Sequence, residues 1–189
     1  METRNIMIIG VGGQGTLLTS RILGGIAMQA GYDVKLSEVH GMAQRGGSVV
    51  TFVRYGDNVA EPIVEEGCAD VIIAFERLEA KRYAHFLKKD GVMIINDQRI
   101  DPITVVTGVA QYPEGIIEEL SQTSKVYTVN AMDEAKRLGN SKVFNIIVLG
   151  VAAQHMDYTK ELWLEVIEKT VPPKTIEINK KAFMTGYEM

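Results

Sequence analysis

Short apolar runs separated by helical patterns dominate the first 130 residues of the chain. Residues 6–9 are fully apolar and end in Gly10, which is typical of a strand buried on both faces of a parallel sheet. Apolar side chains then recur every three or four residues over 18–30, which predicts a helix that ends at Gly31. A strand predicted at 33–39 completes a strand–helix–strand unit of about 35 residues.

The same alternation continues along the chain and defines the fold class. Further strands are expected at 48–54, 69–75, 91–96 and 125–130, with a short edge or hairpin strand at 104–109. Helices are expected at 76–89 and 114–122, and from about residue 133 the chain is helical at 133–138, 142–156 and 159–170, with a short tail after 179. This order predicts a single α/β domain over 1–189, a three-layer α/β/α sandwich around a mostly parallel or mixed Rossmann-like sheet.

Length, composition and charge narrow the class of protein. The 189 residues are 46% hydrophobic and 23% charged, ordinary values for a folded domain. The formal net charge of −4 shows no basic excess, so nucleic acid is not an expected partner. The longest apolar stretch, 143–153, is about half a membrane span and contains Asn145. The first residues lack the apolar core of a signal peptide, so a cytoplasmic protein that does not enter the membrane is expected.

Side chains that bind metals are few. Cys68 is the single cysteine, so the chain forms no internal disulfide and cannot supply the four thiolates of an iron–sulfur cluster. His40, His85 and His155 are too scattered along the sequence to indicate a zinc site. We expect no metal in this chain, and any redox centre of its system lies in another chain.

A glycine-rich turn follows the first predicted strand. Residues 10–15 read Gly-Val-Gly-Gly-Gln-Gly, a G-x-G-x-x-G pattern between a strand and a helix. Glycines let the backbone turn sharply and approach a ligand, and the helix N-terminus beyond them stabilises an anion. Three interpretations are open from these residues alone: a phosphate-type ligand, NAD with Glu38 at the ribose hydroxyls, or close strand–helix packing without a ligand.

A second loop, rich in glycine and polar residues, follows the second predicted strand. Residues 38–48 read Glu-Val-His-Gly-Met-Ala-Gln-Arg-Gly-Gly-Ser. Gly46 and Gly47 permit positive φ, so that successive N–H groups can form a concave anion nest. Arg45 can add a forked clamp for a phosphate or carboxylate, or pair with an acidic group of another subunit. His40 is a weak candidate for a proton donor, and a loop histidine without a catalytic role is the favoured interpretation.

These two loops, together with Ala74-Phe-Glu-Arg-Leu-Glu-Ala80, resemble a known family. The combination is similar to the gamma-type domain of 2-oxoacid:ferredoxin oxidoreductases, and in particular to small (beta) subunits of the indolepyruvate:ferredoxin type. The likeness covers nearly the whole chain and includes Val143-Phe-Asn-Ile-Ile-Val-Leu-Gly150 and Pro172-Pro173. His40-Gly-Met42 departs from the Tyr-Gly pattern of the pyruvate and 2-oxoglutarate members.

The resemblance implies a division of labour between two kinds of subunit, two copies of each. A larger subunit would carry thiamine diphosphate and iron–sulfur clusters and would meet ferredoxin. The holoenzyme would convert an aryl pyruvate, coenzyme A and oxidised ferredoxin to an arylacetyl-coenzyme A, carbon dioxide and reduced ferredoxin. This chain would hold no catalytic residue and would help to bind coenzyme A through two sets of residues: Gly12, Gly13, Gln14 and Gly15, and Gln44, Arg45, Gly46 and Gly47.

Two other functions compete with this one. An independent NAD-dependent oxidoreductase would bind nicotinamide without a partner, with Glu38 at the ribose. A non-catalytic nucleotide-sensing module would bind adenine nucleotides and would not depend on a thiamine enzyme. The oxidoreductase-subunit hypothesis requires that the two glycine-rich loops lie close together in the fold.

Overall fold

The computed structural model describes residues 1–41 and 46–189. Within them, one sheet has the strand order β2-β3-β1-β4-β5-β6. The strands are β1 (Arg4–Val11), β2 (Asp33–His40), β3 (Ser48–Gly56), β4 (Ala69–Ala74), β5 (Leu87–Asn96) and β6 (Lys125–Val129). β1, β4, β5 and β6 are parallel, whereas β3 runs antiparallel to β1 and to β2. The predicted α/β class with a mostly parallel, mixed sheet is confirmed.

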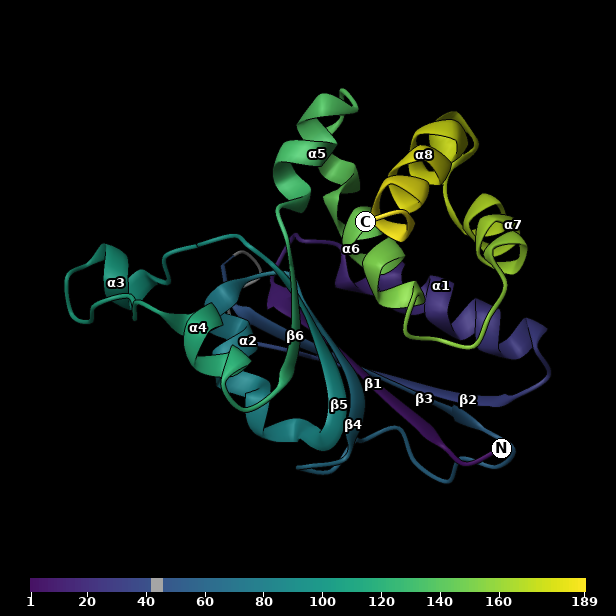
Figure 1. Cartoon of the computed structure of the whole chain (residues 1–189), viewed down its shortest axis with the longest axis horizontal. Helices are drawn as coiled ribbons and strands as arrows, with labels where there is room; N and C mark the ends of the chain where they lie inside the picture. Colours follow the sequence, from purple (N-terminus) through teal and green to yellow (C-terminus); the bar gives the residue numbers. More distant parts are fainter. Residues whose placement is uncertain (42–45) are drawn as a thin grey trace.

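Helices cover both faces of this sheet (Figure 1). They are α1 (Thr16–Gln29), α2 (Arg77–Tyr83), α3 (Ile103–Val106), α4 (Ile116–Ser121), α5 (Ala131–Arg137), α6 (Phe144–Ala153), α7 (Lys160–Thr170) and α8 (Ile176–Tyr187), with short 3-10 turns η1 (Ala84–Phe86), η2 (Ser141–Val143) and η3 (Pro173–Thr175). One face packs against α1, α5, α6, α7 and α8, and the other against α2 and α4. No helix of the described segments is both long enough and apolar enough to span a membrane.

Strand β1 shows why its apolar run is continuous. Successive side chains on a strand point to opposite faces. Ile6 and Ile8 therefore join the core beneath α1 and α6, while Met7 and Ile9 join the core beneath α2 and α4. All four are completely buried. A central strand covered on both faces needs apolar residues at every position, which is the pattern in the sequence.

Two predicted elements differ from the structure. The helix expected at 76–89 ends at Tyr83, and β5 begins at Leu87, which pairs with Ala69 of β4. Lys88 in this strand forms an ion pair with Asp70 of β4. Residues 87–89 also fit a helical pattern, but pairing with β4 places them in the sheet. The prediction of an edge or hairpin strand at 104–109 is wrong. The backbone turns instead into α3 directly after Pro102, whose carbonyl accepts from the Val106 N–H at 3.0 Å.

Candidate functional site

The two glycine-rich loops lie next to each other in the fold. The Gly12 N–H donates to the Gly47 carbonyl at 2.9 Å, and Val11 of β1 pairs with Ser48 of β3. The first loop therefore leaves β1 where the second enters β3, at the carboxyl ends of β1 and β2. α/β proteins bind ligands at this edge of their sheets. Of the eight predicted binding residues, Gln44 and Arg45 lie outside the described residues.

The backbone of both loops borders open space. Gly13 has a φ of +99° and Gly46 a φ of +78°, and a Cβ atom added to either would meet no atom of the described residues within 4 Å. Gly15, with a φ of +87°, is the N-cap of α1. The partial positive charge at the start of this 14-residue helix therefore borders the loops. Open glycine backbone beside a helix N-terminus fits the phosphate groups of a nucleotide-like coenzyme.

Gln14 has a different place from its neighbours. Its side chain is buried, and its Oε1 accepts from the Val11 N–H at 2.7 Å. Its Nε2 donates to the Phe75 carbonyl at 3.0 Å and to Gln98 Oε1 at 3.1 Å. Both ends of the amide are therefore committed to holding the loop against β4 and β5. The backbone N–H of Gln14 is used as well, because it donates to the Val11 carbonyl at 3.1 Å.

Asn145 is a residue of this region that the sequence interpretation did not assign to the loops. It is buried in the first turn of α6, and its Nδ2 donates to the Gly15 carbonyl at 3.3 Å. A Cβ atom at Gly15 would overlap this amide. The sequence contains a signal for this role, because Asn145 is the single polar residue at the start of an apolar run. A buried amide needs hydrogen-bond partners, so its presence there indicates a polar contact.

Glu38 closes the other side of the first loop. Its Oε2 accepts from Thr51 Oγ1 at 2.8 Å and from Thr16 Oγ1 at 3.2 Å, and its Oε1 lies 2.7 Å from His40 Nε2. This carboxylate thus ties β2 to β3 and to the start of α1. Ribose hydroxyls could reach it only in competition with these contacts, which weakens the case for an NAD site. The ring of His40 is largely exposed at the mouth of the loops.

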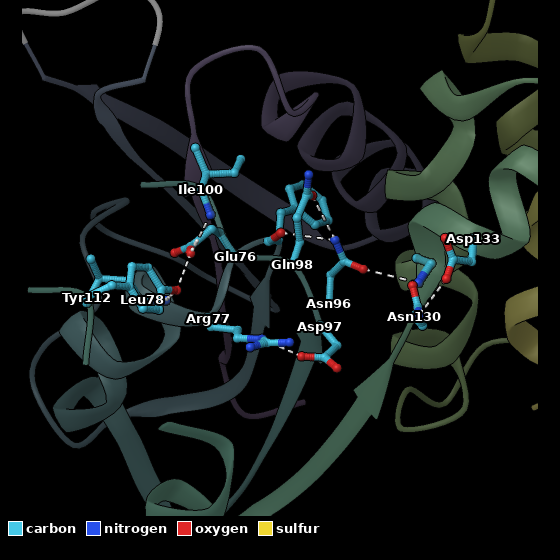
Figure 2. A network of polar contacts seen from close by, with 12 residues as sticks. Glu76, Arg77, Leu78, Asn96, Asp97, Gln98, Ile100, Tyr112, Asn130 and Asp133 are labelled. Atoms are coloured by element: carbon cyan, nitrogen blue, oxygen red, sulfur yellow. Dashed lines mark hydrogen bonds and ion pairs between the residues drawn. The ribbon is translucent and has the colours of Figure 1, made fainter. Parts of the chain in front are cut away.

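Beside the glycine loops, the edge continues over β4, where a buried carboxylate replaces open backbone (Figure 2). Glu76 is 1% exposed and caps α2 by accepting from the Glu79 N–H at 2.9 Å. Its other oxygen accepts from the Ile100 N–H at 3.1 Å and from the Tyr112 hydroxyl at 2.5 Å. Burial and the neighbouring carboxylate raise the pKa of Tyr112. Both carboxylate oxygens of Glu76 are therefore used within the fold at this strand end.

A buried amide performs the same task at the end of β5. Asn96 Nδ2 donates to the Phe75 carbonyl and to Gln98 Oε1, each at 3.1 Å, and its Oδ1 accepts from the Ala131 N–H at 3.1 Å (Figure 2). Gln98 Oε1 and the Phe75 carbonyl are also the two acceptors used by Gln14. One continuous set of hydrogen bonds therefore joins the first glycine loop to β4, β5 and α5.

An open pocket of about 460 Å³ lies beyond this network. Arg77, ion-paired with Asp97, lines one part of it. Arg99 lines another part, with its guanidinium carbon 4.4 Å from the centroid of the Tyr112 ring. The lining mixes both signs of charge, and each arginine already has a carboxylate partner. This pocket therefore offers less to an anion than the glycine loops do.

The fold is a Rossmann-like α/β domain in which two glycine-rich loops adjoin at the carboxyl edge of the sheet. The chain belongs to the pyruvate ferredoxin/flavodoxin oxidoreductase family, whose model matches residues 5–189. It is 45% identical to indolepyruvate oxidoreductase subunit IorB of Archaeoglobus fulgidus, over 97% of this chain and 93% of the relative. It is 42% identical to IorB of Thermococcus kodakarensis, over 98% and 95%. Pyruvate oxidoreductase subunit PORC of Thermotoga maritima shares the fold, with a TM-score of 0.76 and 22% identity over 100% of this chain and 97% of that one.

Proposed function

We propose that this chain is the small subunit of a 2-oxoacid:ferredoxin oxidoreductase that acts on aryl pyruvates such as indolepyruvate. A larger partner subunit holds thiamine diphosphate and the iron–sulfur clusters. The observation that carries the proposal is the junction of the two glycine-rich loops through Gly12 and Gly47. The family membership and the names of the relatives that match nearly the whole chain support the same reading.

The reaction is an oxidative decarboxylation. The bond between the carboxyl and keto carbons of the 2-oxoacid breaks, carbon dioxide leaves, and the acyl group forms a thioester with coenzyme A. Ferredoxin is the oxidant that takes up the two electrons released, and the thiol proton goes to solvent. Iron–sulfur clusters of the partner subunit would supply the path for these electrons. Thiamine diphosphate, held by the partner subunit, would supply the electron sink for the decarboxylation.

The part of this chain is to bind and orient coenzyme A. The open backbone at Gly13 and Gly46 and the N-terminus of α1 would hold phosphate groups of the coenzyme. Gln14 would keep the loop in shape, since its side-chain amide and its backbone N–H are both used within the fold. Arg45 would add a charge-assisted clamp. Binding of this kind lowers the entropy cost of bringing the thiol to the acyl group.

The test begins with purification of the native complex through a tag on this chain. The proposal expects a larger partner that contains thiamine diphosphate and iron–sulfur clusters, and ferredoxin reduction that needs indolepyruvate, coenzyme A and both chains. Arg45→Ala should raise the KM for coenzyme A, whereas Arg21→Ala, at an exposed position of α1, should not. A chain that purifies alone and binds NAD in a titration would contradict the proposal.

A further inference from the structure

An aliphatic arm projects from the sheet between β5 and α4. We define it as residues 99–115, which include α3, and Figure 1 shows α3 at the end of a loop that stands away from the other elements. Its outer side chains are Ile103, Val106 and Val109, exposed by 72%, 68% and 79%. These are the three highest values among the large hydrophobic side chains of the described residues. Clustered apolar exposure of this kind marks an interaction site.

The arm holds a fixed shape through its own hydrogen bonds. The Thr107 N–H donates to the Ile103 carbonyl at 2.9 Å, which closes the turn of α3. The Ala110 N–H donates to the Thr104 carbonyl at 2.9 Å, which ties the segment after α3 back to this helix. Val105 points inward and packs against the core beneath α2. The three exposed side chains are therefore presented by a structured element.

A buried carboxylate anchors both ends of the arm. Glu76 accepts from the Ile100 N–H on the outgoing side and from the Tyr112 hydroxyl on the returning side. Tyr112 is buried in turn, with Arg99 over its ring. Pre-organising a binding element in this way reduces the entropy lost when a partner orders it.

The charges around the arm argue against a lipid surface as its partner. Residues 102–111 carry no charged side chain. The flanks hold one arginine, Arg99, against two acids, Asp101 and Glu114, so the whole arm has a net charge of −1. Segments that bind membrane surfaces carry basic residues beside their apolar ones, because the lipid headgroups are anionic.

The size of the apolar tip argues against a second copy of the chain. A stable dimer buries roughly 800 Å² on each partner. Three aliphatic side chains at the end of a projecting arm supply only a part of that area, and symmetric contact between two tips would keep the rest of the molecules apart. A projecting tip is suited to a recess in a partner that is also held by other surfaces.

We propose that the arm inserts Ile103, Val106 and Val109 into an apolar recess of the larger catalytic subunit. This inference rests on the proposed function and goes beyond it by naming the contact. The arm is then the element that fixes the small subunit on its partner, and Glu76 is the residue that positions the arm.

Site-directed cross-linking in the assembled complex tests the contact. Cys68→Ser removes the single cysteine, and Thr107→Cys, at an exposed position between the aliphatic side chains, then carries a benzophenone maleimide. Illumination should link the arm to the larger subunit, and the same label at Met28→Cys, on an exposed residue at the end of α1, should not form that link. Links between two copies of this chain, or no enrichment over the Met28 control, would overturn the proposal.

An assembly measurement completes the test. Ile103→Ser with Val106→Ser should lower the ratio of small subunit bound to the larger subunit to total small subunit in the extract by at least about tenfold, which corresponds to ~1.4 kcal/mol. Met28→Ser is the control and should leave that ratio unchanged. Equal ratios for the arm variant and wild type would overturn the arm proposal alone. Failure of the wild-type chain to bring down a subunit with thiamine diphosphate and iron–sulfur clusters would overturn the proposed function as well.

Discussion

The carboxyl edge of the sheet has two halves that use polar groups in opposite ways. At the ends of β1 and β2, Gly13 and Gly46 present bare backbone to open space. At the ends of β4 and β5, Glu76 and Asn96 are almost fully buried, and their polar atoms form hydrogen bonds within the fold. Both halves stand where α/β sheets bind ligands. Position on the edge is therefore insufficient to identify a ligand site. Polar groups that border open space are a better guide than polar groups already hydrogen-bonded within the fold.

The two halves are also physically connected. The Phe75 carbonyl accepts from Gln14 on the glycine side and from Asn96 on the other, and Gln98 Oε1 accepts from the same two amides. The buried half thus fixes the first glycine loop in place. Substitutions in the buried half should lower stability first, whereas those at the open glycines should lower ligand affinity at a smaller cost in stability.

Glu76→Ala is expected to have the largest effect on stability. It removes the N-cap of α2, worth about 1 kcal/mol. It also leaves the Ile100 N–H and the Tyr112 hydroxyl without their shared acceptor, at about 1–3 kcal/mol for a buried group that loses its partner. The free energy of unfolding of the purified chain, measured by urea denaturation, should fall by about 3 kcal/mol. An exposed glutamate supplies the control: Glu119→Ala, which loses a surface ion pair with Lys81, should cost about 0.5 kcal/mol or less.

Gly15→Ala comes next, because two costs act at one position. An alanine at a φ of +87° is strained by about 1–2 kcal/mol, and its Cβ would overlap the Asn145 amide. We expect a loss of about 2 kcal/mol in the free energy of unfolding. Asn145→Ala relieves the overlap but keeps the strain, so the double variant should be more stable than the sum of the single changes predicts. Strict additivity would show that the Asn145 contact does not constrain the loop.

Gly13→Ala separates ligand binding from stability most directly. Its φ of +99° imposes a similar strain, but its Cβ meets no neighbour among residues 1–41 and 46–189, so the stability loss should stay near 1 kcal/mol. Gly31 ends the same helix α1 with a φ of +89° and equally open surroundings, which makes Gly31→Ala the matched control. Only Gly13→Ala should raise the KM for coenzyme A in the complex, on the order of tenfold or ~1.4 kcal/mol. The same change in KM for both variants would remove the glycine edge from coenzyme binding.

Periodicity predicts the sheet well and predicts the edge of the site only in part. The buried strands are recognisable because the central residues of β1 and β4, 6–9 and 71–74, are all apolar. The start of β5 is hidden, because residues 87–90 suit an amphipathic helix, and long-range pairing with β4 decides the outcome. The structure of the arm is not evident from the sequence for a related reason. Ile103, Val106 and Val109 have the composition of a strand, but the chain forms a helical turn directly after Pro102.

The same limit applies to individual side chains of the site. Glycine patterns at 10–15 and 46–47 indicate the two loops, and the structure brings these loops together. Gly13 and Gly46 border open space, whereas a Cβ atom at Gly10 or Gly15 would overlap a neighbouring side chain. The direction of a side chain does not follow from such a pattern. Gln14 lies within the motif, yet its side chain points into the fold. Asn145, which lies 130 residues after Gly15, donates to the Gly15 carbonyl. Contacts between distant segments depend on packing, which spacing alone cannot specify.

Tyr112→Phe should have the smallest effect, and it is visible mainly through pH. Burial and the Glu76 carboxylate raise the pKa of Tyr112 above its ordinary value of 10.0. In the unfolded chain this phenol ionises near pH 10, whereas in the folded chain it stays protonated. The stability that it contributes is therefore present below pH 10 and is lost as the pH rises further.

Urea denaturation across this pH range tests the assignment. At neutral pH, Tyr112→Phe should cost about 1 kcal/mol for the lost hydrogen bonds with Glu76 and Leu78. Above pH 10 the wild-type chain should lose stability more steeply, so the difference between the two proteins should narrow. Tyr55 and Tyr158 also have raised pKa values, but they are present in both proteins and cancel in the comparison. A difference that stays constant up to pH 11 would mean that Tyr112 ionises alike in the folded and unfolded chains, and that the Glu76 network is open to solvent.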